Sequence, residues 1–145
     1  MKMKRRDSRE SSFALLFEWS FKEQDTLDEM IEQATDARDL EVDRFSRELA
    51  GKAIDNVAEI DEAIESYSQN WKLSRLSKVT LAALRLSMCE LMYFSDIPPG
   101  ATINEAVELV KKYGTEDEAA FLNGVLGSYA RSAGADEIPS TGAEE

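Results

Sequence analysis

Lysine and arginine residues gather at the start of the chain, where they could bind phosphate groups. The cations of this basic arm, residues 1–9, are Lys2, Lys4, Arg5, Arg6 and Arg9. A helix that begins at Asp7 or Ser8 would place them beside backbone N–H groups that also attract anions. The basic arm is therefore a candidate nucleic-acid contact, although a short solvated terminus has the same composition.

A second basic zone lies in the middle of a chain that is otherwise acidic, with a net charge of −12. No aspartate or glutamate occurs from Ser66 to Cys89. The cations of this zone are Lys72, Arg75, Lys78 and Arg85. Two basic zones on an acidic body would orient a polyanion such as RNA toward one face. The rings of Phe17, Trp71 and Phe121 could stack on unpaired bases, or equally belong to the core.

The residue types on which most enzymes depend are missing. The chain has no histidine and one cysteine, Cys89, so the usual zinc ligands and the usual general base are absent from the sequence. It has no glycine-rich phosphate loop, and Ser77 beside Lys78 is better explained as a helix cap than as a nucleophile. The carboxylates of residues 59–65 fit a solvated helix face. We therefore expect no enzymatic activity, no metal and no cofactor.

Residues 76–94 carry two apolar stripes at helical spacing. The first contains Leu76, Val79, Ala83 and Leu86, and the second contains Leu81, Leu84, Met88 and Leu91. A surface helix has one such stripe, so the pattern predicts a central helix buried among its neighbours. Its charged residues and its length argue against a membrane span.

Other helices are marked by sites where an acidic residue follows a capping residue by three positions. These sites are Asp7–Glu10, Thr26–Glu29, Thr102–Glu105 and Thr115–Glu118. The apolar spacing predicts one long helix over residues 42–68 and a short turn at 72–75, and Gly114 is expected as a left-handed cap. No stretch alternates with period two, so the fold class is all-α with about six to seven helices.

The length of the chain fits one domain, which we place at residues 1–132. Residues 133–145 are acidic and poor in apolar side chains, so we expect a disordered tail. The sequence has no signal-peptide core, no membrane-spanning run and a single cysteine. This profile indicates a cytoplasmic protein.

Three stretches carry a more specific signature. They are RRDSRESSFALLF at residues 5–17, WKLSRLSKVTLAALRLSMCEL at 71–91 and DIPPGATINEAVELVKKYGTEDEAAFLNGVLGSYA at 96–130. Together they resemble the NusB family of bacterial transcription antitermination factors over about residues 4–131. The order INEAVEL, KKYGTED, FLNGVL is highly specific. The resemblance implies two three-helix sub-bundles packed across one another around the central helix.

The resemblance also implies a function. NusB proteins act with NusE, a small-ribosomal-subunit protein, to bind boxA-type single-stranded RNA in nascent ribosomal RNA and to help the RNA polymerase antitermination complex resist termination. By position, the implied RNA contacts are Lys4, Arg5, Arg6, Arg9, Phe17, Asn70, Trp71, Arg75, Asp117 and Phe121. The implied NusE contacts are Ser77, Thr80 and Arg85.

The chain departs from the family pattern in ways that weaken RNA binding. Ala14 and Phe17 stand where the family usually has glutamine and tyrosine, and Ala119–Ala120 where relatives often have a basic residue. We therefore expect weak RNA binding by the chain alone and tighter binding with a basic partner. One alternative is a helical protein-interaction module with little RNA affinity. Another is the related domain of ribosomal RNA cytosine methyltransferases, for which about 14 residues after the last helix leave no room for a cofactor domain.

Overall fold

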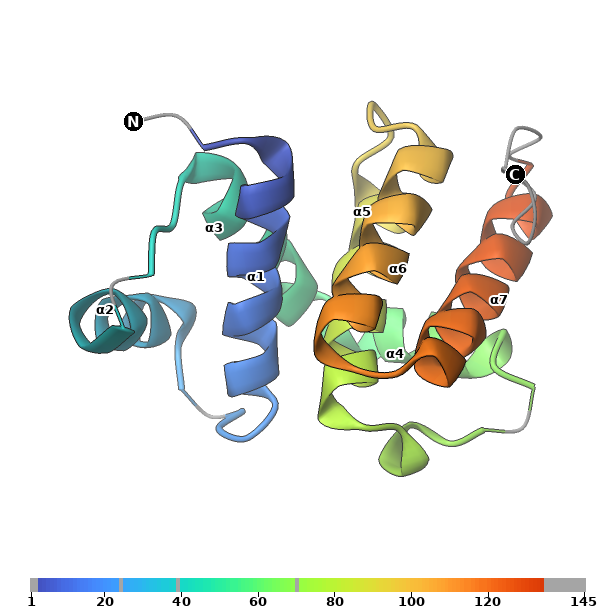
Figure 1. Ribbon diagram of the computed structural model, residues 1–145, viewed down its shortest axis with the longest axis horizontal. Coiled ribbons are helices and arrows are strands. Elements are labelled where there is room, and N and C mark those ends of the chain that lie inside the picture. The colour runs from blue at the N-terminus through green and yellow to red at the C-terminus, as the bar shows by residue number, and fades with distance from the viewer. Residues whose placement is uncertain (1–2, 24, 39, 70, 135–145) are drawn as a thin grey trace.

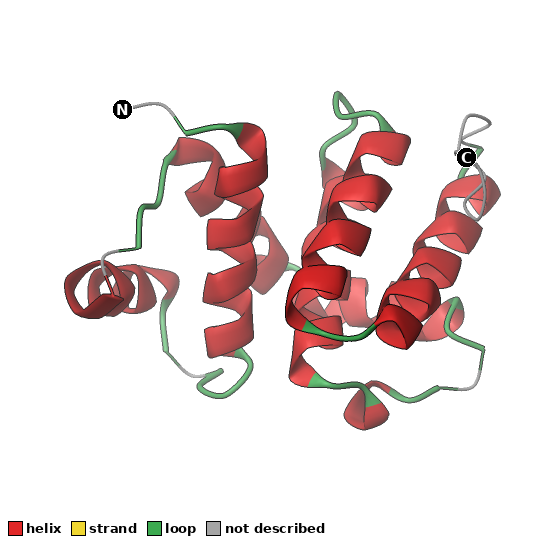
Figure 2. Ribbon diagram, in the orientation of Figure 1, coloured by secondary structure: helices red, strands yellow, loops and turns green. Residues whose placement is uncertain are grey.

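The computed structural model describes residues 3–23, 25–38, 40–69 and 71–134, which form seven α-helices, one short 3-10 turn and no strand (Figure 2). The elements are α1 (Arg5–Trp19), α2 (Leu27–Arg38), α3 (Arg44–Asp55), α4 (Val57–Ser66), η1 (Leu73–Arg75), α5 (Lys78–Tyr93), α6 (Pro99–Tyr113) and α7 (Glu116–Ser132). The predicted all-α class is confirmed. Of the predicted disordered tail, residues 135–145 lie outside the described residues.

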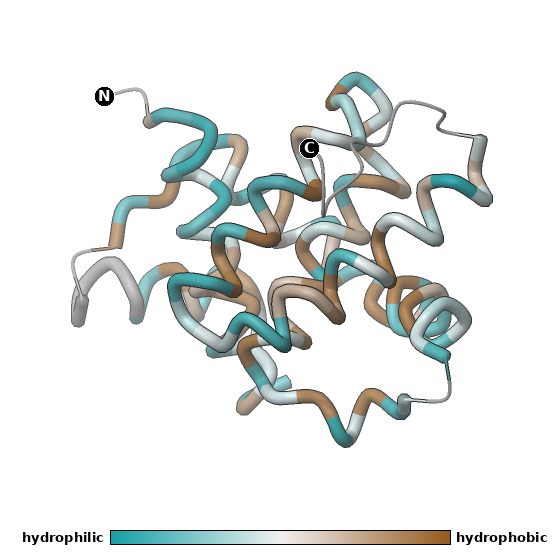
Figure 3. Tube along the Cα trace, turned by 45° about the vertical axis from the view of Figure 1, so that its right-hand side comes forward, coloured by the Kyte–Doolittle hydropathy of each residue, from teal (hydrophilic) through white to brown (hydrophobic). Residues whose placement is uncertain are grey.

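Two three-helix sub-bundles meet along α5. Helices α1, α2 and α3 form one sub-bundle, on the left of Figure 1, and α5, α6 and α7 form the other, with α4 packed on α5. Helix α5 contacts α1, α3, α4, α6 and α7, and every residue from Thr80 to Glu90 is buried. The predicted central helix is therefore confirmed. Hydrophilic and hydrophobic residues are interspersed along the helices, as expected for amphipathic helices (Figure 3).

Side-chain caps set the starts of the helices that lie around the site described below. Ser77 accepts a hydrogen bond from the backbone N–H of Thr80 at 3.1 Å, where α5 begins. Thr115 and Glu118 form a complete capping box at the start of α7, as predicted. The predicted turn is also present as η1. Because these contacts are local, spacing in the sequence was sufficient to predict them.

The start of α1 differs from the prediction. The helix begins at Arg5 with Lys4 as its N-cap, and no side chain caps it, so Asp7 and Glu10 do not form a capping box. Glu10 instead accepts a hydrogen bond from Lys112 of α6. Most of the predicted arm thus belongs to the first turn of a helix, which holds its side chains in defined directions.

Three further predictions are corrected. Helix α6 begins at Pro99 instead of near Thr102, because the fixed φ of proline suits the first helical turn. The helix predicted over residues 42–68 is interrupted at Asn56, whose φ of −120° and ψ of 25° are not helical. Gly114 ends α6 with a φ of −127°, so it is not a left-handed cap.

Helix α1 has a polar face and an aromatic face. On the polar face, Ser12 donates to the backbone oxygen of Ser46 in α3 at 2.9 Å, and Ser46 donates to the backbone oxygen of Ser8 at 3.0 Å. Small side chains at this contact let α1 and α3 approach closely. Phe13 and Phe17 occupy the aromatic face and pack against the main core. The aromatic face therefore lies along the seam between the two sub-bundles.

Candidate nucleic-acid interface

The start of α1 presents three exposed cations, one of them on the N-cap residue. Lys4 and Arg5 are exposed, and the Arg5 guanidinium carbon lies 3.8 Å from the centre of the Phe45 ring. Arg6 donates two hydrogen bonds to Glu105 of α6, at 3.0 and 3.1 Å, while its side chain stays 71 % exposed. An ion pair this exposed is weak, so a phosphate group can replace the carboxylate. Lys4, Arg5 and Arg6 are therefore available to an incoming polyanion.

Arg9 does not belong to this exposed set. Its guanidinium donates to both carboxylate oxygens of Glu90, at 2.8 and 2.9 Å, and its side chain is 8 % exposed. Thr102 donates a further hydrogen bond to Glu90 at 2.8 Å. The structure thus places the predicted RNA contact Arg9 in the interior, apart from the exposed cations of the arm. The residue joins α1 to α5 and α6 instead.

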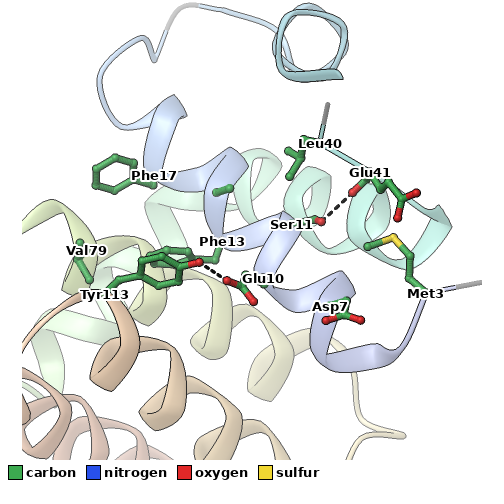
Figure 4. A pocket seen from close by; sticks show the side chains of 11 residues that line it. Met3, Asp7, Glu10, Ser11, Phe13, Phe17, Leu40, Glu41, Val79 and Tyr113 are labelled. Atoms are coloured by element: carbon green, nitrogen blue, oxygen red, sulfur yellow. Dashed lines mark hydrogen bonds between the residues drawn. The ribbon is translucent and has the colours of Figure 1, made fainter. Parts of the chain in front are cut away.

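A groove with a volume of about 630 Å³ follows α1 from Met3 to Phe17 (Figure 4). Val79 and Tyr113 line the end of the groove near Phe17. Phe13 and Tyr113 stack with their ring centres 5.3 Å apart, and Phe17 lies 6.3 Å from Phe13. The predicted RNA contact Phe17 is half-buried in this groove, so one part of its ring remains accessible.

Glu10 links the two sides of this seam. Lys112 donates to its carboxylate at 2.7 Å, and the Tyr113 hydroxyl donates to the same oxygen. Burial acts to raise the pKa of Glu10, but the hydrogen bonds from Lys112 and Tyr113 outweigh it and hold the pKa below its ordinary value of 4.5. Glu10 is thus ionised at neutral pH. It pairs with Lys112, which could otherwise bind a phosphate.

Predicted RNA contacts from separate parts of the chain converge at a second cavity, with a volume of about 290 Å³. Trp71 and Phe121 meet edge to face with ring centres 6.0 Å apart, and Trp71 is 51 % exposed. Arg75 of η1 and Asp117 of α7 line the same cavity. Asn70, which was predicted beside Trp71, lies outside the described residues. Exposed rings beside a cation can stack a base and bind a phosphate.

Two of the predicted partner contacts, Ser77 and Thr80, line this second cavity as well. Ser77 is exposed, whereas Thr80 is buried. A hydrogen bond from Ser77, joined by bonds from Thr115, lowers the pKa of Glu118 below its ordinary value. The start of α5 is therefore held against the start of α7, which fixes the shape of the cavity.

The third predicted partner contact, Arg85, is buried. Its guanidinium donates two hydrogen bonds to Asp61 of α4, at 2.9 and 2.8 Å, and its side chain is 8 % exposed. The structure thus places the predicted partner contact Arg85 in an ion pair that is largely buried. Asp61 is partly buried in this ion pair, whereas its sequence context predicted a solvated carboxylate.

Residues at the start of α5 line both cavities. Val79 lines the α1 groove and Ser77 lines the cavity beside Trp71. Between them, Lys78 lies 5.5 Å from the centre of the Phe21 ring. In Figure 1 the first turn of α1 is at the top, and η1 and the start of α7 are at the bottom. Helix α1 alone extends about 22 Å, so the surface spans several nucleotides.

Sequence reasoning missed two aromatic residues on this surface. Phe21 is 60 % exposed and Tyr113 is 46 % exposed, beside Lys78 and Lys112 respectively. Lys78 was noticed as part of the basic zone, but its ring neighbour comes from the distant end of α1. In the sequence, the run KKYG at residues 111–114 places a cation directly beside Tyr113.

The described residues hold no cluster of three or more side chains suited to a metal ion. None of their helices is long and apolar enough to cross a membrane. Cys89 is buried in α5, and burial raises the pKa of its thiol to about 12. A thiol of this kind is not a nucleophile at neutral pH. The described part of this surface offers cations and ring faces, which can bind phosphates and bases.

Comparison with known proteins decides the family. The model of the NusB family matches residues 6–131. The chain belongs to the NusB family. Transcription antitermination protein NusB of Natranaerobius thermophilus is 39 % identical over 133 residues, covering 88 % of this chain and 95 % of that protein. NusB of Agathobacter rectalis is 39 % identical over 131 residues, covering 88 % of this chain and all of that protein.

Solved NusB structures have the same fold. NusB of T. maritima is 35 % identical with a TM-score of 0.77, and the match covers 97 % of each chain. A complex of the antitermination factors NusB and NusE with dsRNA matches with a TM-score of 0.79 at 27 % identity, covering 88 % of this chain and 96 % of that one. The predicted family and its fold are thus confirmed.

Proposed function

We propose that this protein is a transcription antitermination factor that binds boxA RNA together with NusE and helps RNA polymerase resist termination in ribosomal RNA operons. One observation carries the proposal: Trp71, Arg75 and Phe121 meet at one cavity, and the start of α5 lines both this cavity and the α1 groove. The antitermination function of curated NusB relatives supports it. Nascent transcripts place such a factor in the bacterial cytoplasm.

The surface suits single-stranded RNA. Bases that are not paired expose their faces, and Trp71 with Phe121 offers rings on which such a base can stack. Lys4, Arg5 and Arg6 supply cations for phosphates at the far end of the α1 groove. A strand that follows the groove contacts phosphate ligands and stacking rings in turn. Arg9 has no part in this path, because it is buried.

The charges explain why a partner is needed. Glu105 pairs with Arg6, and Glu10 pairs with Lys112. RNA phosphates must therefore displace these two carboxylates before they can bind Arg6 and Lys112. The net charge of −12 adds a repulsive field. A basic protein docked beside the RNA would offset both effects. We place NusE next to Ser77, which is exposed at the edge of the second cavity.

The experiment is a fluorescence-anisotropy titration of labelled boxA RNA with the chain alone and with the chain plus NusE, over a series of salt concentrations. A scrambled boxA RNA is the control. We expect weak binding by the chain alone, tighter binding with NusE and a clear preference for boxA. Equal affinity with and without NusE would contradict the role of the partner. Failure to prefer boxA over the scrambled RNA would favour a protein-interaction module instead.

A further inference from the structure

We infer that a third cavity, on the far side of the Trp71–Phe121 pair, binds one further nucleotide of the RNA with Arg131 as its phosphate ligand. This inference rests on the proposed RNA-binding function. The cavity has a volume of about 320 Å³ and lies between the segment after α4 and one face of α7. Sites for small ligands range over roughly 300–1,000 Å³, so this one suits a single nucleotide.

The aromatic pair is shared between this cavity and the one that contains Arg75. Trp71 and Phe121 line both. A nucleotide that stacks on the pair therefore has a hollow on each side into which the strand can continue. The third cavity extends the surface that begins at the first turn of α1.

The distribution of unpaired arginines points to the same path. Ion pairs with carboxylates occupy the guanidinium groups of Arg6, Arg9, Arg44, Arg47 and Arg85. Arg5 lies over the Phe45 ring. Among the residues that the structure describes, no ion pair includes Arg75 or Arg131. Arg75 lines the cavity on one side of the aromatic pair, and Arg131 lines the cavity on the other.

The geometry of α7 directs Arg131 toward the aromatic pair. Phe121, Gly124 and Arg131 follow one another at helical spacing, so they share a face of the helix. A Cβ atom built on Gly127 would lie 3.2 Å from Nη1 of Arg131. The guanidinium therefore lies beside the turn before it, displaced toward the end of α7 that carries Phe121, and it lines the same cavity as that ring.

Gly124 leaves the floor of the cavity open. It is exposed, and a Cβ atom built there would meet no atom within 4 Å. A larger side chain at this position can therefore begin without a clash at Cβ and extend into the cavity. Leucine also forms helices better than glycine, so Gly124→Leu is a blocking variant that should fold.

The test measures RNA binding by the complex of the chain with NusE. The RNAs are boxA RNA and versions lengthened or shortened by one nucleotide at a time at each end. The variants are Arg131→Ala, which removes the phosphate ligand, and Gly124→Leu, which blocks the cavity. Arg44→Ala is the matched control, because Arg44 is a 92 % exposed arginine on α3, in the other sub-bundle. Circular dichroism confirms that each variant folds.

We expect both variants to weaken binding of the longest RNA about threefold or more, and to lower the salt slope by about 0.7, which is the value for one phosphate contact on a single strand. The effect disappears once the nucleotide that enters the cavity is removed, and Arg44→Ala changes nothing. If either variant binds every RNA as the wild type does, the third cavity is not a nucleotide site, while the proposed function stands. If the wild-type complex does not prefer boxA, both the nucleotide site in the third cavity and the proposed function are contradicted.

Discussion

Arg9 and Glu90 form a buried ion pair that joins α1 to α5 through two hydrogen bonds, at 2.8 and 2.9 Å. The side chain of Glu90 is 1 % exposed, and Thr102 of α6 donates a third hydrogen bond to it. Three helices from both sub-bundles therefore meet at one charged cluster. Three positions before Arg9, Arg6 forms a pair on the surface, so neighbouring arginines of one helix have separate roles.

Arg9→Ala is expected to destabilise the fold strongly. It leaves the Glu90 carboxylate buried without its partner, a situation that typically lowers the free energy of unfolding by about 3–5 kcal/mol. Urea denaturation at neutral pH measures the change. Arg6→Ala is the control, since Arg6 is exposed and its loss should leave stability nearly unchanged while weakening RNA binding. Equal stability of the two variants would show that the buried pair has no structural role.

Removing either ring of the aromatic pair should weaken RNA binding. Base stacking on an aromatic side chain contributes about 1–3 kcal/mol, so Trp71→Ala or Phe121→Ala should raise the Kd of the NusE complex by about fivefold or more. The double variant should lose less binding free energy than the two single variants added together, because the two rings contact each other. Anisotropy titrations measure these effects. Tyr93→Ala, at the opposite end of α5, is the aromatic control and should bind as the wild type does.

Glu105→Gln should tighten RNA binding at low salt. The substitution keeps the size of the side chain but removes the carboxylate that competes with phosphate for Arg6. The gain should shrink as salt is added, because screening weakens the exposed pair in the wild type. Glu48→Gln is the matched control, since Glu48 pairs with Arg44 on α3. A gain of the same size in both variants would mean that only net charge matters.

The contribution of Asp43 to stability should be lost in acid. This residue caps α3 and accepts hydrogen bonds from Ser8 of α1 at 2.6 Å and from the backbone of Ser46 at 2.8 Å. Burial acts to raise the pKa of Asp43, but these bonds outweigh it and hold the pKa below 3.8. The folded carboxylate therefore binds protons more weakly than the unfolded one. Its contribution is complete above pH 3.8 and is lost as the pH falls through the lower folded pKa.

Asp43→Asn tests this, because asparagine keeps an oxygen that can cap the helix but does not titrate. Urea denaturation of the wild type and the variant is compared from neutral pH down to the acid range. We expect the stability of the variant to decline less steeply below pH 3.8 than that of the wild type. Parallel curves would mean that Asp43 contributes nothing to the acid sensitivity.

Much of the fold was predictable from local patterns. The caps at Ser77 and Thr115 depend on residues three positions apart, and the two apolar stripes of α5 depend on helical spacing. The break at Asn56 was not predictable, because the apolar spacing of residues 42–68 continues through it. The family signature then indicated which residues to examine for RNA binding, and Trp71, Arg75, Asp117 and Phe121 do meet at one cavity.

The amino-acid sequence alone therefore predicts most of the helices, the buried α5 and the family. It does not reveal which cations are available to RNA. In the sequence Arg9 resembles Arg6, and Arg85 resembles Arg75, yet Arg9 and Arg85 are buried against Glu90 and Asp61. Whether a charge is neutralised depends on contacts between distant helices, and those contacts exist only once the two sub-bundles have packed. Local spacing predicts most of the helices, whereas long-range packing decides which of their cations stay exposed.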